Sequence, residues 1–68
     1  MDWTDVEEIG IALVEAHPGV DPLTVRFTQL REWILQLPDF QGDPASSSEG
    51  KLEAAQMAWF EEWKDARE

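Results

Sequence analysis

The sequence contains no cysteine, which excludes disulfide bonds and thiolate metal sites in this chain of 68 residues. It contains a single histidine, so a structural zinc site of the usual type and an iron site built from two histidines and one carboxylate are also excluded. No run of about 18 apolar residues is present, and we expect no membrane span. The start Met1-Asp2-Trp3 lacks the basic and apolar regions of a secretory signal, so the expected location is the cytoplasm.

Basic residues are scarce as well, because five Lys and Arg face 15 Asp and Glu, for a net charge of −10. A surface of this kind repels nucleic acid and anionic lipid headgroups, and it attracts cations and basic protein patches. Binding to DNA depends largely on the neutralisation of phosphates by Lys and Arg, so a nucleic-acid partner is not expected. Strongly acidic chains are often disordered, but 43% hydrophobic residues, including four Trp and three Phe, favour a folded domain.

Three segments are predicted to be helical, at about residues 4–17, 28–37 and 46–65, and proline-containing connections separate them. In the first segment, Val6, Ile9 and Leu13 repeat at helical spacing. Thr4 and Glu7 have the spacing of a capping box, which favours a helix start at Thr4.

The second and third segments show the same kind of pattern. Thr28 is the predicted N-cap of the second helix, and Pro38 ends it. Ser46 or Ser47 is the predicted cap of the third, with Ser46 and Glu49 at capping-box spacing. The predicted buried stripe of the second helix contains Leu30, Trp33, Ile34 and Leu37. In the third helix Leu52, Ala55, Trp59 and Trp63 lie on one face, with Trp63 expected to be partly exposed near the helix end.

The connections carry signals of their own. Asp21-Pro22 is typical of a turn, in which the Asp side chain bonds forward to the backbone. Phe40 is expected to fill a gap in the core. Because three amphipathic helices in so short a chain bury their stripes only against one another, we expect a single domain over residues 1–68. The predicted fold is mainly α, a small three-helix orthogonal bundle with a helix-turn-helix-like, winged-helix-like corner and little or no β structure.

Catalysis is not expected from these residues. Nucleophilic catalysis requires Ser, Cys or Thr beside a positioned base, but His17 lies at a predicted helix end and the serines at 46–48 lie where a helix needs caps. Carboxylates offer weak cation binding, because their oxygens are hard ligands. The candidates are Asp5 and Glu8, Asp39 and Asp43, and Glu61 and Glu62. The alternative is that these are ordinary solvated helix faces.

Two strings are the most specific features of the chain: Asp-Pro-x-Thr-Val-Arg-Phe-Thr at residues 21–28 and Asp-Phe-x-x-Asp-Pro at residues 39–44. With Trp3-Thr4-Asp5 and Glu8-Ile9-Gly10, and with collinear matches to about Glu62, the sequence resembles the IscX (YfhJ) family. Two departures are Gln41-Gly42, where the family often has acidic residues, and His17, where it often has Tyr.

The resemblance implies a small acidic accessory protein of iron–sulfur cluster assembly, winged-helix-like but without DNA binding. It implies docking on the cysteine desulfurase IscS, competition with bacterial frataxin, and weak iron binding without a tightly bound cofactor. The implied iron ligands are Asp5, Glu8, Glu61 and Glu62. The implied partner-binding face contains Asp5, Glu8, Glu15, Asp39, Asp43, Glu61 and Glu62.

Several points stay open from sequence. The protein is expected to be a monomer, but iron donation and iron-dependent regulation are both compatible with the residues, as are activation and inhibition of the desulfurase. The tail at residues 63–68 has no assigned role. The alternative function is an acidic interaction module for another basic partner, with no role for iron.

Overall fold

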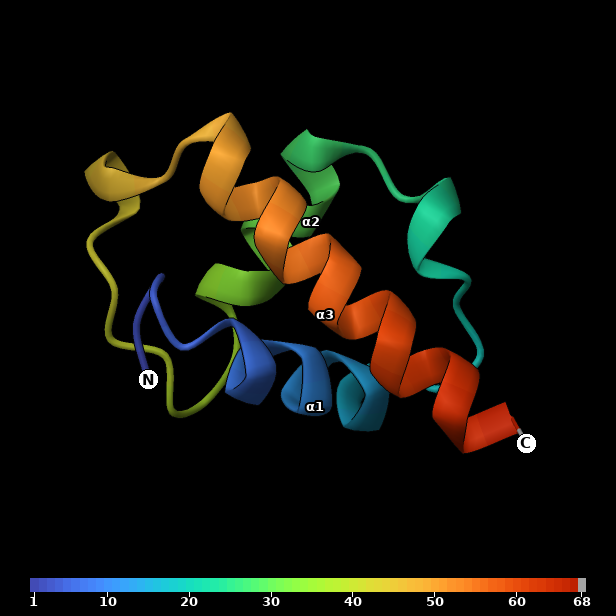
Figure 1. Cartoon of the computed structure of the whole chain (residues 1–68). Helices are drawn as coiled ribbons and strands as arrows, with labels where there is room; N and C mark the ends of the chain where they lie inside the picture. The colour runs from blue at the N-terminus through green and yellow to red at the C-terminus, as the bar shows by residue number, and fades with distance from the viewer. Residues whose placement is uncertain (68) are drawn as a thin grey trace.

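Three α-helices carry most of the chain in the computed structural model, which describes residues 1–67 (Figure 1). Within this range, α1 spans Val6–Ala16, α2 spans Phe27–Leu35 and α3 spans Glu49–Arg67, with single 3-10 turns at Pro22–Thr24 and Pro44–Ser46. No strand occurs in these residues, and the prediction of a mainly α, three-helix fold is confirmed. The last residue of the tail, Glu68, lies outside the described residues.

The core lies where α1 and α2 meet the inner side of α3, the longest helix, which runs across the molecule in Figure 1. Its buried side chains come from all three helices and from the segments beside them: Trp3, Ile9, Leu13, Leu30, Ile34, Leu37, Leu52, Ala55 and Trp59. Trp33, predicted in a buried stripe, is only half-buried. Trp63 is partly exposed and Phe40 packs against the core, both as expected. Trp3 was not predicted in the core and is almost fully buried.

Gly10 allows α1 and α3 to approach closely. A Cβ atom added to Gly10 would lie 2.8 Å from the carbonyl carbon of Ala58 and 2.9 Å from the amide nitrogen of Trp59. These are backbone atoms, so a side chain at residue 10 would force the two helices apart. Glycine in a helix interior costs roughly 1 kcal/mol relative to alanine, and here the close packing of the two helices offsets that cost.

The turn before α1 differs from the predicted capping box of Thr4 and Glu7. The N-cap residue is Asp5, and its side chain makes no cap bond to the helix. Instead, both Asp side chains accept hydrogen bonds earlier in the chain. The N–H of Asp2 donates to the Asp5 carboxylate at 2.9 Å, and Thr4 donates its N–H and hydroxyl to the Asp2 carboxylate at 2.9 and 2.7 Å. These two short side chains satisfy the backbone in a turn, so α1 starts after residue 5 rather than at residue 4.

The second helix starts one residue before, and ends two residues before, the predicted 28–37. Its N-cap position is Arg26, so the predicted cap Thr28 lies inside the first turn. The end comes early because Pro38 disfavours helical geometry at Leu37. Leu37 nevertheless stays buried in the core.

The third helix starts three residues later than predicted and uses a different serine as its cap. The hydroxyl oxygen of Ser48 accepts a backbone N–H of the first turn at 3.2 Å. The predicted caps were wrong because both serines are engaged elsewhere: Ser46 closes the preceding 3-10 turn, and the Ser47 hydroxyl accepts from Nε of Arg31 at 3.0 Å. The predicted pairing of Ser46 with Glu49 is therefore absent. At its other end, α3 continues to Arg67, beyond the predicted residue 65.

The connection between α1 and α2 contains the turn that the sequence predicted at Asp21-Pro22. The Asp21 carboxylate accepts the N–H of Leu23 at 3.0 Å, which confirms the predicted turn. The side chain of Gln56 on α3 donates to the carbonyl of Pro22 at 2.9 Å and attaches this turn to the bundle. His17 follows α1 and stacks on Trp33 of α2, with ring centroids 3.9 Å apart.

The N-terminus lies beside the connection between α2 and α3 (Figure 1). The N-terminal ammonium donates to the carbonyl of Asp39 at 3.0 Å, and the N–H of Gln41 donates to the carbonyl of Met1 at 2.7 Å. The indole Nε1 of Trp3 donates to the carbonyl of Asp43 at 2.7 Å. We call this part of the molecule, residues 1–5 with residues 39–48, the N-terminal end.

Candidate partner-binding surface

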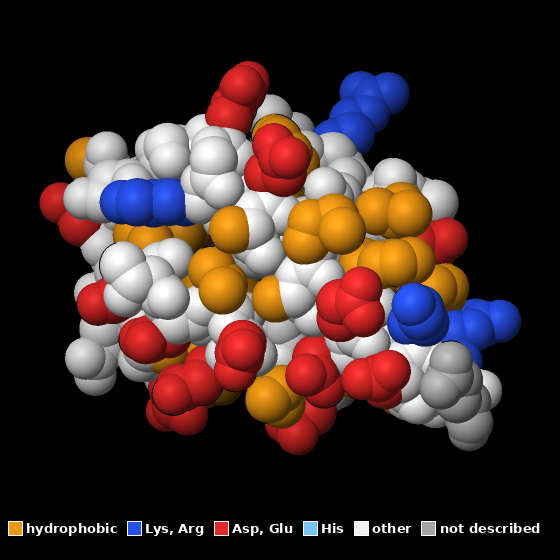
Figure 2. All heavy atoms as spheres, viewed as in Figure 1, with side chains coloured by type: hydrophobic (Ala, Val, Ile, Leu, Met, Phe, Trp, Pro, Cys, Tyr) orange, Lys and Arg blue, Asp and Glu red, His pale blue; other side chains and the backbone are white. Residues whose placement is uncertain are grey.

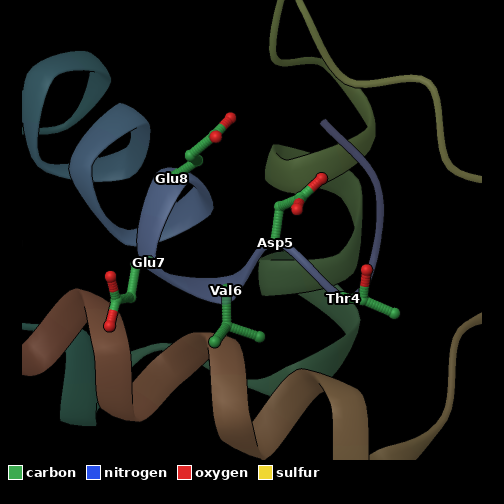
Figure 3. A pocket seen from close by; sticks show the side chains of 5 residues that line it. All are labelled: Thr4, Asp5, Val6, Glu7 and Glu8. Atoms are coloured by element: carbon green, nitrogen blue, oxygen red, sulfur yellow. The ribbon is translucent and has the colours of Figure 1, made fainter.

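The first turn of α1 gathers three carboxylates around a shallow depression of about 330 Å³. Its lining is Thr4, Asp5, Val6, Glu7 and Glu8. Figure 3 shows the Asp5 and Glu8 carboxylates on one side of this turn, whereas Val6 and Glu7 point toward α3. One Asp5 oxygen already accepts the N–H of Asp2, so its carboxylate is partly engaged within the chain.

A second, larger hollow of about 530 Å³ lies between α1 and α3, and we call it the α1–α3 groove. It is lined by Val6, Glu7, Met57, Ala58, Glu61 and Glu62. On α3, residues four apart are neighbours on one face, which places Glu61 beside Met57 and Glu62 beside Ala58. The groove therefore has an apolar floor and carboxylates around it.

The two hollows share Val6 and Glu7 and so form one continuous surface. The two predicted pairs, Asp5 with Glu8 and Glu61 with Glu62, therefore line adjoining hollows although they are more than 50 residues apart in sequence. We call these four residues and Glu7 the acidic surface. Figure 2 shows Asp and Glu side chains crowded along the lower edge of the molecule, the edge that α1 occupies in the same view of Figure 1.

Glu7 and Met57 are the residues of this surface that the sequence prediction missed. The sequence predicted Glu7 as part of a capping box, so it was not considered as a surface residue between the two predicted pairs. Met57 is 47% exposed although it is large and apolar. Its position outside the stripe of Leu52, Ala55 and Trp59 predicts exposure, but a single exposed apolar residue does not by itself indicate a partner.

The other predicted residues lie elsewhere. Glu15 is exposed near the end of α1, and Asp39 is exposed in the connection after α2, where its carbonyl accepts the N-terminal ammonium. Asp43 lies in a third depression, of about 260 Å³, whose lining includes Asp2 and Lys51. The Asp43 carboxylate accepts the N–H of Ala45 at 2.9 Å. A role of these three residues in partner binding stays a prediction.

We searched the described part of the chain for side chains arranged as metal ligands. No group of three or more His, Asp or Glu side chains within residues 1–67 is arranged to hold a metal ion. Carboxylate oxygens do suit iron as hard ligands, so loose binding of the ion by one or two surface carboxylates remains a prediction.

The Asp2 carboxylate lies in a turn whose hydrogen bonds change its pKa. Its pKa is lowered from the ordinary value, first by the hydrogen bond from the Thr4 hydroxyl and then by the bond from the Thr4 backbone N–H. This perturbation lies in the N-terminal end, outside the acidic surface. Its cause is the local turn, so it gives no indication of acid–base chemistry.

Comparison with known proteins adds the family. A family profile described as iron–sulphur cluster assembly, that of IscX, matches residues 1–64. The chain belongs to the IscX family. It is 53% identical over 62 residues to an uncharacterized protein of Pseudomonas aeruginosa, a match that covers 91% of this chain and 94% of that protein.

Membership of the IscX family confirms the resemblance read from the two sequence strings, and it extends the match two residues beyond Glu62 into the tail. The family is one of iron–sulphur cluster assembly, so assembly is the process in which this chain is placed. None of the helices in residues 1–67 combines the length and apolar character needed to cross a membrane.

Proposed function

We propose that this chain is a non-enzymatic accessory protein of iron–sulfur cluster assembly that docks on the cysteine desulfurase IscS through its acidic surface. The observation that carries the proposal is the continuous surface of Asp5, Glu7, Glu8, Glu61 and Glu62, assembled from α1 and α3. Surface charges of one sign steer a partner of opposite sign and fix its orientation. The partner surface is therefore basic, and the setting is the cytoplasm.

The residue inventory limits the role within assembly. This chain has no cysteine, so it neither holds a cluster through thiolates nor accepts a persulfide sulfur. Scaffold and sulfur carrier are therefore unsuitable roles for it. A docking protein that modulates the desulfurase, in competition with bacterial frataxin for the same basic surface, suits its chemistry.

Iron enters this proposal as weakly held cargo or as a signal. Asp5 with Glu8, and Glu61 with Glu62, supply the oxygen ligands. Because residues 1–67 contain no formed group of three ligands, water completes the coordination and the affinity is low. Occupation of these carboxylates by iron lowers the negative charge of the docking surface, which links iron to desulfurase binding.

The proposal is tested by measuring the affinity of the protein for purified IscS at several salt concentrations. Docking through the acidic surface predicts a dissociation constant that rises steeply with salt, and a further weakening in the Glu7→Gln, Glu61→Gln double variant. A matched control is Glu49→Gln, Glu53→Gln, which removes two exposed carboxylates from the opposite half of α3. Equal weakening by both double variants, or no binding at low salt, contradicts the proposal.

The alternative is an acidic module for another basic protein, without iron. It is favoured by the lack of a formed metal site in residues 1–67. Titration of ferrous iron into the isotopically labelled protein separates the two. Localised NMR changes at the acidic surface support the iron role, whereas uniform weak changes at all carboxylates favour the alternative.

A further inference from the structure

The α1–α3 groove offers more than negative charge. Its apolar lining consists of Met57, Ala58 and Val6, and residue Met57 is 47% exposed. Exposed apolar area is costly in water, and burying an aliphatic side chain against it is favourable. Charge attraction alone does not require such a floor.

Packing of the two helices keeps this floor in place. Gly10 lies against the backbone of Ala58, one turn of α1 beyond Val6, and holds the two helices close together at that point. Ala58 presents only a methyl group to the groove, and the larger Val6 and Met57 flank it. The hollow of about 530 Å³ is therefore a consequence of core packing rather than of a loop.

Carboxylates surround the floor and are free to bind a partner. Within the described residues, the Asp side chains at 2, 5, 21 and 43 accept backbone N–H groups, whereas Glu7, Glu61 and Glu62 accept no hydrogen bond from another residue. The groove lining contains no Lys or Arg. Three unengaged carboxylates around an apolar floor complement a cationic segment that carries an apolar side chain.

We propose, resting on the docking function above, that the groove binds a segment of the partner in which one aliphatic side chain is flanked by Lys or Arg. The aliphatic side chain lies on Met57, Val6 and Ala58, and the flanking cations pair with Glu7, Glu61 and Glu62. The apolar contact fixes the register of the complex, because exposed ion pairs alone are weak and screened by salt. Buried apolar anchors surrounded by polar contacts are the usual centre of protein interfaces.

A direct test uses two synthetic peptides of equal length and charge, Ac-GRKGLGRKG-NH2 and the same peptide with serine in place of leucine. Each is titrated into the labelled protein at low salt and followed by NMR. We expect the leucine peptide to bind at least about fivefold more tightly, and the methyl signals of Met57 and Val6 to shift with it. Equal affinities, or shifts that avoid these two methyl groups, overturn the groove proposal.

A second test uses IscS and two matched variants of the protein. Met57→Gln removes the apolar floor without changing charge, and Leu23→Gln changes another exposed apolar residue, 57% exposed on the 3-10 turn after α1. We expect Met57→Gln to weaken binding roughly five- to tenfold with an unchanged salt dependence, and Leu23→Gln to leave binding unchanged. Binding that Met57→Gln does not weaken overturns the groove proposal and leaves the docking function standing.

The two tests also identify the case in which the docking function is wrong but the groove proposal is correct. If IscS does not bind at all while the leucine peptide retains its preference and its Met57 shifts, the proposed desulfurase function is wrong and the groove proposal is supported. If neither IscS nor the leucine peptide binds at the groove, both proposals are overturned.

Discussion

The N-terminal end and the α1–α3 groove are both rich in carboxylates, but they use them in opposite ways. At the N-terminal end, Asp2, Asp5 and Asp43 accept backbone N–H groups and hold turns together. Within the described residues, the Glu side chains of the groove make no such bond and extend from helix faces. The carboxylates behind the net charge of −10 therefore have two roles. Some of them maintain the fold, and others are available to a partner.

Side-chain length and local structure explain the difference. Asp is short enough to reach a backbone N–H two residues further along in a turn, so it is used where the chain changes direction. Glu61 and Glu62 lie in the interior of a helix, where the backbone donors are already paired with one another. The apolar residues of the two regions also differ. Trp3 is buried and hydrogen-bonded at the N-terminal end, whereas the apolar residues that line the groove are aliphatic or Met.

The largest expected effect comes from breaking the helix contact on which the groove depends. Gly10→Ala places a methyl group 2.8 Å from the Ala58 carbonyl carbon, and we expect it to destabilise the fold by about 2 kcal/mol. The measurement is chemical denaturation. Gly50→Ala is the matched control, because its Cβ meets only the Ser48 hydroxyl at 4.0 Å, and it should stabilise α3 by up to about 1 kcal/mol. Equal stability of Gly10→Ala and wild type would show that the helices are not in close contact there.

The next effect separates folding from binding at the N-terminal end. Trp3→Phe keeps an aromatic ring beside Phe40 but removes the indole donor to the Asp43 carbonyl. We expect a loss of about 1 kcal/mol in the free energy of unfolding, with IscS affinity unchanged under conditions where the variant is folded. A loss of affinity without a loss of stability would instead place the N-terminal end in the partner interface.

A third prediction concerns stability when the groove loses its charges. Glu7→Gln, Glu61→Gln and Glu62→Gln together should change the free energy of unfolding by less than about 1 kcal/mol, because no hydrogen bond within residues 1–67 uses these carboxylates and Glu7 alone of the three lies in the first turn of a helix. The comparison variant is Asp43→Asn, whose carboxylate holds the 3-10 turn before α3. Thermal unfolding distinguishes them, and a triple variant less stable than Asp43→Asn would contradict the proposed division of the carboxylates.

The smallest effect is a change in titration. Because folding lowers the pKa of Asp2, its ionised form favours the folded state above the ordinary carboxyl pKa, and this contribution is lost as pH falls through the lowered pKa. Thr4→Val removes the hydroxyl that contributes most, so the pKa of Asp2 should rise toward its ordinary value, as followed by carboxyl NMR. Thr24→Val is the control, since that hydroxyl donates to a backbone carbonyl. An unchanged Asp2 pKa in Thr4→Val would rule out the assigned cause.

The sequence predicted the helices well and their ends less well. Hydrophobic spacing identified Ile9, Leu13, Leu30, Ile34 and Trp59 as core residues, because this pattern depends on packing along a whole helix. The caps were wrong because Thr, Ser and Asp residues cluster at every helix start, and capping-box spacing does not choose among them. Tertiary contacts made the choice, as with the bond between Ser47 and Arg31.

The candidate site was predicted in part for a similar reason. Asp5, Glu8, Glu61 and Glu62 were identified, but their continuity depends on Glu7 and on the packing of α1 against α3, which no local pattern encodes. Gly10 marks that packing in the structure. In the sequence, Gly10 is only one position of the matched string Glu8-Ile9-Gly10. Its packing role depends on where the neighbouring helix lies.

We expect a partner to bind the carboxylates of the groove and to leave Asp2 and Asp43 of the N-terminal end in place. The most direct measurement is an NMR titration of the labelled protein with IscS at low and high salt. We predict shifts at Val6, Glu7, Met57, Glu61 and Glu62 that fade at high salt, with Trp3 and Asp43 unchanged. Shifts centred on Trp3 and Asp43, with the groove signals unmoved, would contradict the account.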